Sequence, residues 1–194
     1  MTTPPPLTRD MLELVFQPEE LVTTPESALD GVTHPDTRHV LATLGIPVRD
    51  NPWFDMAEGL DQRLRPVGDW DWDLSDRYEQ VPPGAERWIS LALIPYDDIA
   101  FDPSTGTVWC LPQDADIRLM NSSLRSFVHF LYILETERPH YDFQMEDSDA
   151  EFEPEASQDR TKEAMREVDP AALDNPQSSW YKVLTYMVDP EHHF

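Results

Sequence analysis

Three aspartates alternate with two tryptophans in the segment DWDWD, residues 69–73. Carboxylates at every second position are the spacing with which a calcium-binding loop begins, because successive ligands turn toward one ion. A loop that starts at Asp69 needs glycine at its sixth position and glutamate at its twelfth, but the sequence has Leu74 and Gln80 there. The segment therefore predicts an acidic surface patch and not a metal site.

The single cysteine, Cys110, could act as a nucleophile if a histidine activated its thiol. It lies in an apolar strand pattern, however, where a free cysteine is commonly a small buried hydrophobe. His129 lies in a helical pattern, and nothing in the sequence places the two in one pocket. The other histidines with candidate metal spacing lack a third ligand: His34, His39, His192 and His193.

Other catalytic patterns are equally weak. Acidic residues are so frequent that close carboxylate pairs arise by composition alone, and they carry no signal for acid–base catalysis. The sequence has no nucleophile elbow, P-loop or dinucleotide fingerprint. We therefore expect no catalytic residue, no metal and no cofactor.

Trp70 and Trp72 leave two interpretations open with about equal weight. In the first, their rings pack against the core and the aspartates face solvent. In the second, the rings anchor a partner protein and the carboxylates supply a complementary field. The second interpretation gives two groups of candidate contacts: Asp69, Trp70, Asp71, Trp72, Asp73 and Asp76, then Asp142, Glu146, Asp147, Asp149 and Glu151.

The charge of the chain indicates the kind of partner. Its 194 residues include 38 acidic and 14 basic side chains, which gives a formal net charge of −24 at pH 7. Carboxylates repel nucleic-acid phosphates and anionic membrane surfaces, so neither is an expected ligand. The charge favours a basic protein partner, or else reflects solubility alone.

Several features predict a soluble cytoplasmic protein. One cysteine permits no internal disulfide, and the N-terminal MTTPPPLTRD lacks the pattern of a signal peptide. The longest apolar stretch, WISLALI, is too short to cross a bilayer. A monomer is favoured, although the sequence does not fix the oligomeric state.

The elements that must position these residues belong to one domain, residues 1–194. Strands are expected at 86–96, covered on both faces, and in a hairpin of 97–101 and 107–111 that turns at Gly106. The alternation at 66–81 slightly favours another strand. Helical spacing and capping residues predict helices at 7–16, 34–47, 124–138 (ended by Pro139), 159–173 and 175–188.

The predicted class is α+β, with a central antiparallel sheet flanked by N- and C-terminal helices. The acidic stretch 138–159 is expected to form a mobile loop or insertion. Helix 124–138 should cover one face of the sheet formed by the preceding hairpin.

Four blocks in order, VLATLGIP, IAFDPSTGTVWCL, MNSSLRSFVHFL and VDPAALDNPQSSWYKVLTYMV, make residues 36–188 resemble the SUKH superfamily. The chain is most similar to its fourth subfamily, which consists of bacterial immunity proteins. The positions that carry the resemblance are Gly45, Pro47, Gly106, Ser122, Ser123, Leu124 and Phe127. The strand at LALIP lacks the glycine expected of the family.

The resemblance implies an α+β fold and a non-enzymatic role. It implies a partner too: a toxin domain, often a nuclease or nucleic-acid deaminase, encoded beside the immunity protein. A nuclease binds phosphates through Lys and Arg, so an acidic surface would complement its groove. Two alternatives stay open: a regulatory or scaffolding module of the same fold, and an enzyme that uses carboxylates or a metal.

Overall fold

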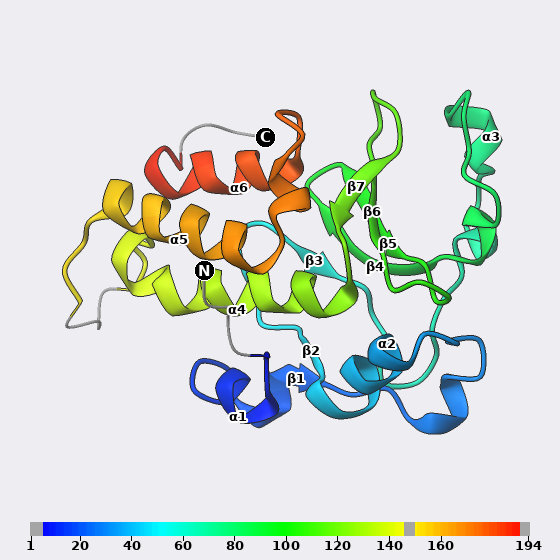
Figure 1. Cartoon of the computed structure of the whole chain (residues 1–194), viewed down its shortest axis with the longest axis horizontal. Coiled ribbons are helices and arrows are strands. Elements are labelled where there is room, and N and C mark those ends of the chain that lie inside the picture. Colours follow the sequence, from blue (N-terminus) through cyan, green and yellow to red (C-terminus); the bar gives the residue numbers. More distant parts are fainter. Residues whose placement is uncertain (1–5, 146–149, 191–194) are drawn as a thin grey trace.

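The computed structural model describes residues 6–145 and 150–190 and has a mixed α+β fold (Figure 1). Its centre is a five-stranded antiparallel sheet in the order β3-β4-β5-β6-β7, and its helices are largely C-terminal. The strands are β3 (Asp55–Met56), β4 (Ile89–Ile94), β5 (Asp97–Phe101), β6 (Val108–Leu111) and β7 (Arg118–Asn121). The predicted class is confirmed.

The hairpin of β5 and β6 forms as predicted. The Asp102 N–H donates to the Thr107 carbonyl (2.9 Å), and the Asp102 carboxylate accepts from the Ser104 N–H (2.8 Å). Gly106 has a φ of 79°, and a Cβ there would lie 2.5 Å from the Thr37 hydroxyl. Glycine therefore fits this turn for two reasons, its backbone conformation and the close approach of the neighbouring helix.

Strand β4 lies inside the sheet between β3 and β5, which confirms that it is a central strand. A bulge between Ser90 and Ala92 interrupts its pairing with β5, so strict alternation of faces fails there. Leu93 is 42% exposed, while Leu91 and Ile94 are buried. The two outer strands of this region, β3 and β7, were not predicted.

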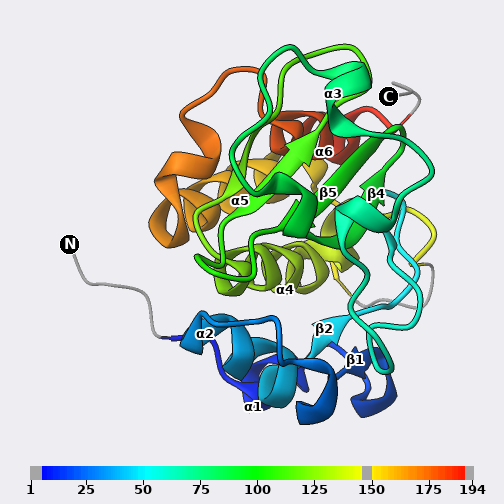
Figure 2. The ribbon, with the colours of Figure 1, turned by 90° about the vertical axis from the view of Figure 1, so that its right-hand side faces the viewer.

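Three C-terminal helices lie against one face of the sheet: α4 (Leu124–Tyr141), α5 (Pro154–Val168) and α6 (Ser179–Val188) (Figures 1 and 2). Ser123 caps α4 by accepting from the Ser126 N–H (3.0 Å), and Ser178 is the N-cap of α6. The main core lies between these helices and the sheet and includes Phe127 and Trp180, both fully buried. The predicted cover of one sheet face is confirmed.

The prediction that Pro139 ends α4 is wrong, because the helix continues to Tyr141. Pro139 has no N–H, so the helix loses one hydrogen bond, to the Glu135 carbonyl. The loss is small because Pro139 lies in the last turn, where carbonyls without helical partners are normal. The acidic stretch 138–159 is also partly helical. Residues 138–141 complete α4, and α5 begins at Pro154, five residues before the predicted start at Asp159.

A buried carboxylate joins the start of α4 to the end of α5. Asp169 is 4% exposed and accepts from the Ser122 N–H (2.7 Å), the Ser122 hydroxyl (2.7 Å), the Ser126 hydroxyl (2.9 Å) and the Asn121 amide (3.2 Å). The positive end of the α4 dipole adds to this stabilisation. The 3-10 helix η6 (Pro170–Leu173) follows directly and leads into α6.

The opposite face of the sheet is covered by residues 66–88 (Figure 2). This segment contains η4 (Val67–Asp69), α3 (Leu74–Arg77) and η5 (Ala85–Arg87), so the strand predicted at 66–81 is wrong. Its buried residues, Val67, Leu74 and Tyr78, are spaced by seven and four positions and not by two. They build a second apolar cluster against Ala100 and Leu111 of the sheet.

The N-terminal part packs below the sheet and α4 in Figure 1. Thr8 caps the short α1, but regular helix covers only one turn of the predicted 7–16. The helix predicted at 34–47 begins at Pro35, turns π-helical from Val40 and ends before Gly45, whose φ is 84°. The elements are α1 (Arg9–Leu12), η1 (Pro18–Glu20), β1 (Leu21–Val22), η2 (Glu26–Ala28), α2 (Pro35–His39), η3 (Val40–Leu44) and β2 (Ile46–Pro47).

Candidate functional site

The first acidic group lies on the segment that covers the outer face of the sheet. Trp70 and Trp72 are half-buried, and their ring centroids are 5.2 Å apart. The Arg77 guanidinium carbon lies 3.8 Å from the Trp72 ring centroid. Both rings pack against the second apolar cluster. Core packing thus accounts for part of each ring, and only the remaining surface is available to a partner.

The carboxylates of this group differ in their surroundings. Asp71, Asp73 and Asp76 are exposed. Asp69 forms an ion pair with Arg63 (2.7 Å). Leu74 is buried beneath α3, which anchors the exposed carboxylates to the sheet and limits their motion.

The described part of the second acidic group lies at the other end of the molecule. The connection from α4 to α5 and helix α3 occupy opposite ends of the long axis in Figure 1. Asp142 is paired with Arg138 (2.8 Å) and Glu151 is exposed, while Glu146, Asp147 and Asp149 lie outside the described residues. The described members of the second group, Asp142 and Glu151, therefore do not share a surface with the first group.

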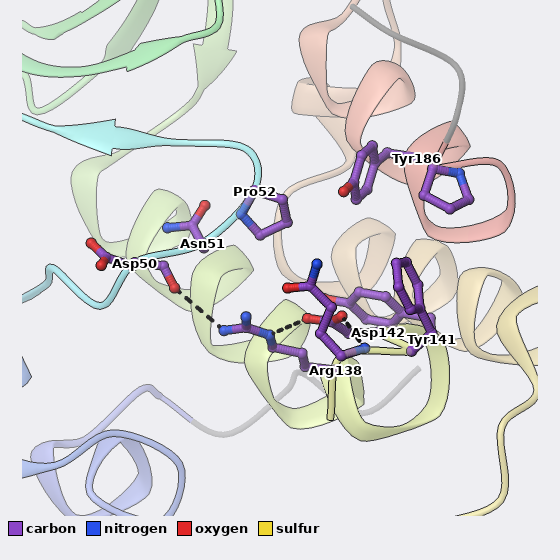
Figure 3. A pocket seen from close by; sticks show the side chains of 10 residues that line it. Asp50, Asn51, Pro52, Arg138, Tyr141, Asp142 and Tyr186 are labelled. Carbon is purple, nitrogen blue, oxygen red and sulfur yellow. Dashed lines mark hydrogen bonds and ion pairs between the residues drawn. The ribbon is translucent and has the colours of Figure 1, made fainter. Parts of the chain in front are cut away.

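Asp142 lines a pocket of about 280 Å³ (Figure 3). Arg138 crosses it: its Nη1 donates to the Asp50 carbonyl (3.4 Å), and its Nε donates to the Asp142 carboxylate (2.8 Å). The Tyr141 hydroxyl donates to the Leu134 carbonyl (3.0 Å), and burial raises the pKa of this phenol. Arg138 therefore joins the end of α4 to the chain near Asp50 across the pocket.

Cys110 is not arranged as a nucleophile. Its Sγ lies 3.4 Å from the Ser179 hydroxyl and 3.9 Å from the Asp97 carboxylate. Burial raises the pKa of the thiol to about 11, so it stays protonated at neutral pH. His129 is on α4, where burial, together with Arg125, lowers the pKa of its ring.

Within 6–145 and 150–190, no group of three or more His, Cys, Asp or Glu side chains is arranged to hold a metal ion. In the same ranges, no helix combines the length and apolar character needed to cross a membrane.

Most cations of the protein are already engaged. Ten of the 14 Lys and Arg side chains lie within 4.0 Å of a carboxylate among the described residues. They are Arg9, Arg38, Arg49, Arg63, Arg77, Arg118, Arg125, Arg138, Arg160 and Lys182. Arg125 is an example: its Nε donates to the Asp36 carboxylate (2.9 Å) and so links α4 to α2. Because carboxylates outnumber these cations, the field toward solvent is negative.

One group of polar residues was not predicted from the sequence. Asp97, Arg118 and Lys182 line one groove, although they come from β5, β7 and α6. No motif joins residues so far apart in the chain. Only the antiparallel pairing of β6 with β7 and the docking of α6 bring them together.

Comparison with known proteins completes the description. A family model described as SUKH-4 immunity protein matches residues 7–186. No curated protein and no solved structure matches the chain. The matched range contains the whole sheet and α4 to η6. Immunity proteins act by neutralising a cognate toxin, and the family is non-catalytic. The chain therefore belongs to the SUKH-4 immunity protein family.

Proposed function

We propose that this immunity protein neutralises a basic toxin domain, either a nuclease or a nucleic-acid deaminase, by covering its cationic groove with an acidic surface. Such enzymes hold phosphates with Lys and Arg, so a carboxylate-rich surface competes for the same groups. The proposal places the encounter in the cytoplasm, where the substrate of such a toxin is present.

The main support for the proposal is that most Lys and Arg side chains of the protein already pair with its own carboxylates. The formal net charge is −24, and ten of 14 cations already lie beside carboxylates among the described residues. An approaching basic protein therefore meets an excess of carboxylates. Complementary fields of this kind accelerate association more than they strengthen the final complex.

Within this surface, the residues around α3 are the preferred contact: Asp69, Trp70, Asp71, Trp72, Asp73 and Asp76. Asp71 and Asp76 are exposed and sit on a segment anchored by the buried Leu74. The half-buried Trp70 and Trp72 add apolar surface between the carboxylates. Asp69 is engaged with Arg63, as Asp142 of the second group is with Arg138, so the exposed Asp71, Asp73 and Asp76 are the more available carboxylates.

The double substitution Asp71→Lys with Asp76→Lys tests this surface. We expect the association rate constant with the toxin domain to fall by about tenfold at low salt, because local attraction becomes repulsion. Stopped-flow mixing measures the rate. Circular dichroism and thermal unfolding should show an intact fold, since both side chains are exposed.

The matched control is Glu163→Lys with Glu167→Lys on α5. Both glutamates are exposed, and the pair changes the total charge by the same amount. Figure 1 places α5 on the far side of the sheet from α3. Equal slowing by both double variants would show that only total charge matters and would remove the α3 surface from the proposal.

A further inference from the structure

A groove of about 880 Å³ lies beside the start of α6. One side is formed by α6, and the other by the β4–β5 turn and the β6–β7 connection. Tyr96, Pro112, Pro176 and Tyr181 give it apolar walls, and Tyr96 is 65% exposed. A groove of this volume and lining suits several residues of an extended chain better than a single small ion.

The groove is lined by cations and carboxylates in equal number. The Asp97 carboxylate is buried and accepts from the Gln113 N–H (3.2 Å). Two cations share it at long range, Arg118 through Nη2 (3.5 Å) and Lys182 through Nζ (3.7 Å). The only other carboxylate that lines the groove, among the described residues, is the exposed Asp114. This balance stands out in a chain whose formal net charge is −24.

The Arg118 guanidinium has a hydrogen-bond donor without a partner among the described residues. Its side chain is only 12% exposed, yet its buried Nε has no hydrogen-bond partner among residues 6–145 and 150–190. Both hydrogen bonds that it makes to described residues come from Nη2, to the Ser179 hydroxyl (3.1 Å) and the Asp97 carboxylate (3.5 Å). A planar guanidinium has five donors and binds a carboxylate through two of them at once. A buried donor without a partner is costly, so an anion that Nε reaches when the Arg118 side chain rotates into the groove would be favoured.

The N-terminus of α6 also favours a negatively charged ligand in the groove. Ser178, its N-cap, lines the groove, and the helix extends for ten residues. The positive end of its dipole therefore lies beside Arg118 and Lys182. Two features, the Arg118 Nε without a partner among the described residues and the N-terminus of α6, favour a further negative charge at one place.

We infer that this groove binds a carboxylate side chain carried by an extended segment of the toxin. The inference rests on the proposed function, because it assigns a second contact to the same partner. The acidic surface around α3 accelerates encounter, and the groove holds one acidic residue of an otherwise basic protein. Burial of that carboxylate against Arg118 slows dissociation and fixes the orientation of the complex.

The first test needs no toxin. N-acetyl-glutamate N-methylamide is titrated into the isotopically labelled protein, and the side-chain Nε–H signals of arginine are followed by NMR. We expect a saturable shift of the Arg118 signal that Lys182→Gln weakens and Arg166→Gln, an exposed cation of α5, leaves unchanged. A signal that stays constant, or one that responds only to inorganic phosphate, would overturn the inference.

The second test uses the complex. We expect Arg118→Gln and Lys182→Gln to raise the dissociation rate constant by about tenfold or more, with little change in association. If Arg118→Gln fails to fold, Lys182→Gln decides alone, because that side chain is 51% exposed. An unchanged dissociation rate in a complex that still forms overturns the groove contact only, whereas failure of the unaltered protein to bind overturns the proposed function.

Discussion

Trp180→Ala is expected to lower the free energy of unfolding by about 3–5 kcal/mol, the range for truncating a large buried aromatic side chain. Trp180 is fully buried, with its ring centroid 4.9 Å from that of Phe130, 5.3 Å from Phe54 and 5.8 Å from Phe127. Its removal leaves a cavity where α4, α6 and the chain before β3 meet. Domains of this size have a total stability of about 5–15 kcal/mol, so the variant should be close to unfolding at 37 °C.

Urea denaturation measures this loss, and Trp180→Phe separates packing from hydrogen bonding. The indole Nε1–H lies 3.2 Å from the Met120 carbonyl and 3.1 Å from the Asn121 side-chain oxygen. Phenylalanine keeps most of the ring but removes this donor, so we expect a smaller loss of about 1–2 kcal/mol. A loss below about 1 kcal/mol for the alanine variant would contradict the described core.

Asp169→Ala should have the second large effect, about 3 kcal/mol, through a different cause. The carboxylate accepts four hydrogen bonds from Asn121, Ser122 and Ser126, which hold the start of α4 against the end of α5. Alanine leaves the Asn121 amide and the Ser126 hydroxyl with fewer partners in a buried place, and each unsatisfied donor costs about 1–3 kcal/mol. Urea denaturation is again the measurement.

Asp174→Ala is the matched control, because Asp174 is an exposed carboxylate only five positions away. We expect a change within about 0.5 kcal/mol for this variant. Asp169→Asn should be nearly as damaging as alanine, since an amide supplies one acceptor and adds donors that face other donors. Equal stability of the Asp169 and Asp174 variants would show that the buried network does not hold the helices together.

The sequence predicted best where the signals were local. Helices α4 and α6 begin at capping serines, Ser123 and Ser178, and Gly106 turns the hairpin, which agrees with the helices and the turn predicted there. Strands β3 and β7 were missed because two to four residues carry almost no periodicity. They form because β4 and β6 offer unpaired edges. The segment 66–81 was misassigned because alternating Asp and Trp imitate the strand period while the buried residues follow another spacing.

The candidate binding surfaces show the same difference between what local sequence predicts and what the tertiary fold determines. Clusters of acidic residues can be recognised in the sequence, but their ion pairs cannot. Asp69 and Asp142 each pair with an arginine that the sequence did not identify as their partner. The groove depends on Asp97, Arg118 and Lys182, which only the tertiary fold unites. Long-range convergence of this kind leaves no pattern within a single window of sequence.

The central claim is that this SUKH-4 protein works by presenting an acidic surface to a basic toxin. The most direct measurement is the association rate constant with the toxin domain encoded beside it, recorded from about 20 mM to about 500 mM salt. The account predicts a one-to-one complex that blocks the toxin and a rate that falls by more than about tenfold across this range. A rate that does not change with salt, or the absence of any complex throughout the range, would contradict it.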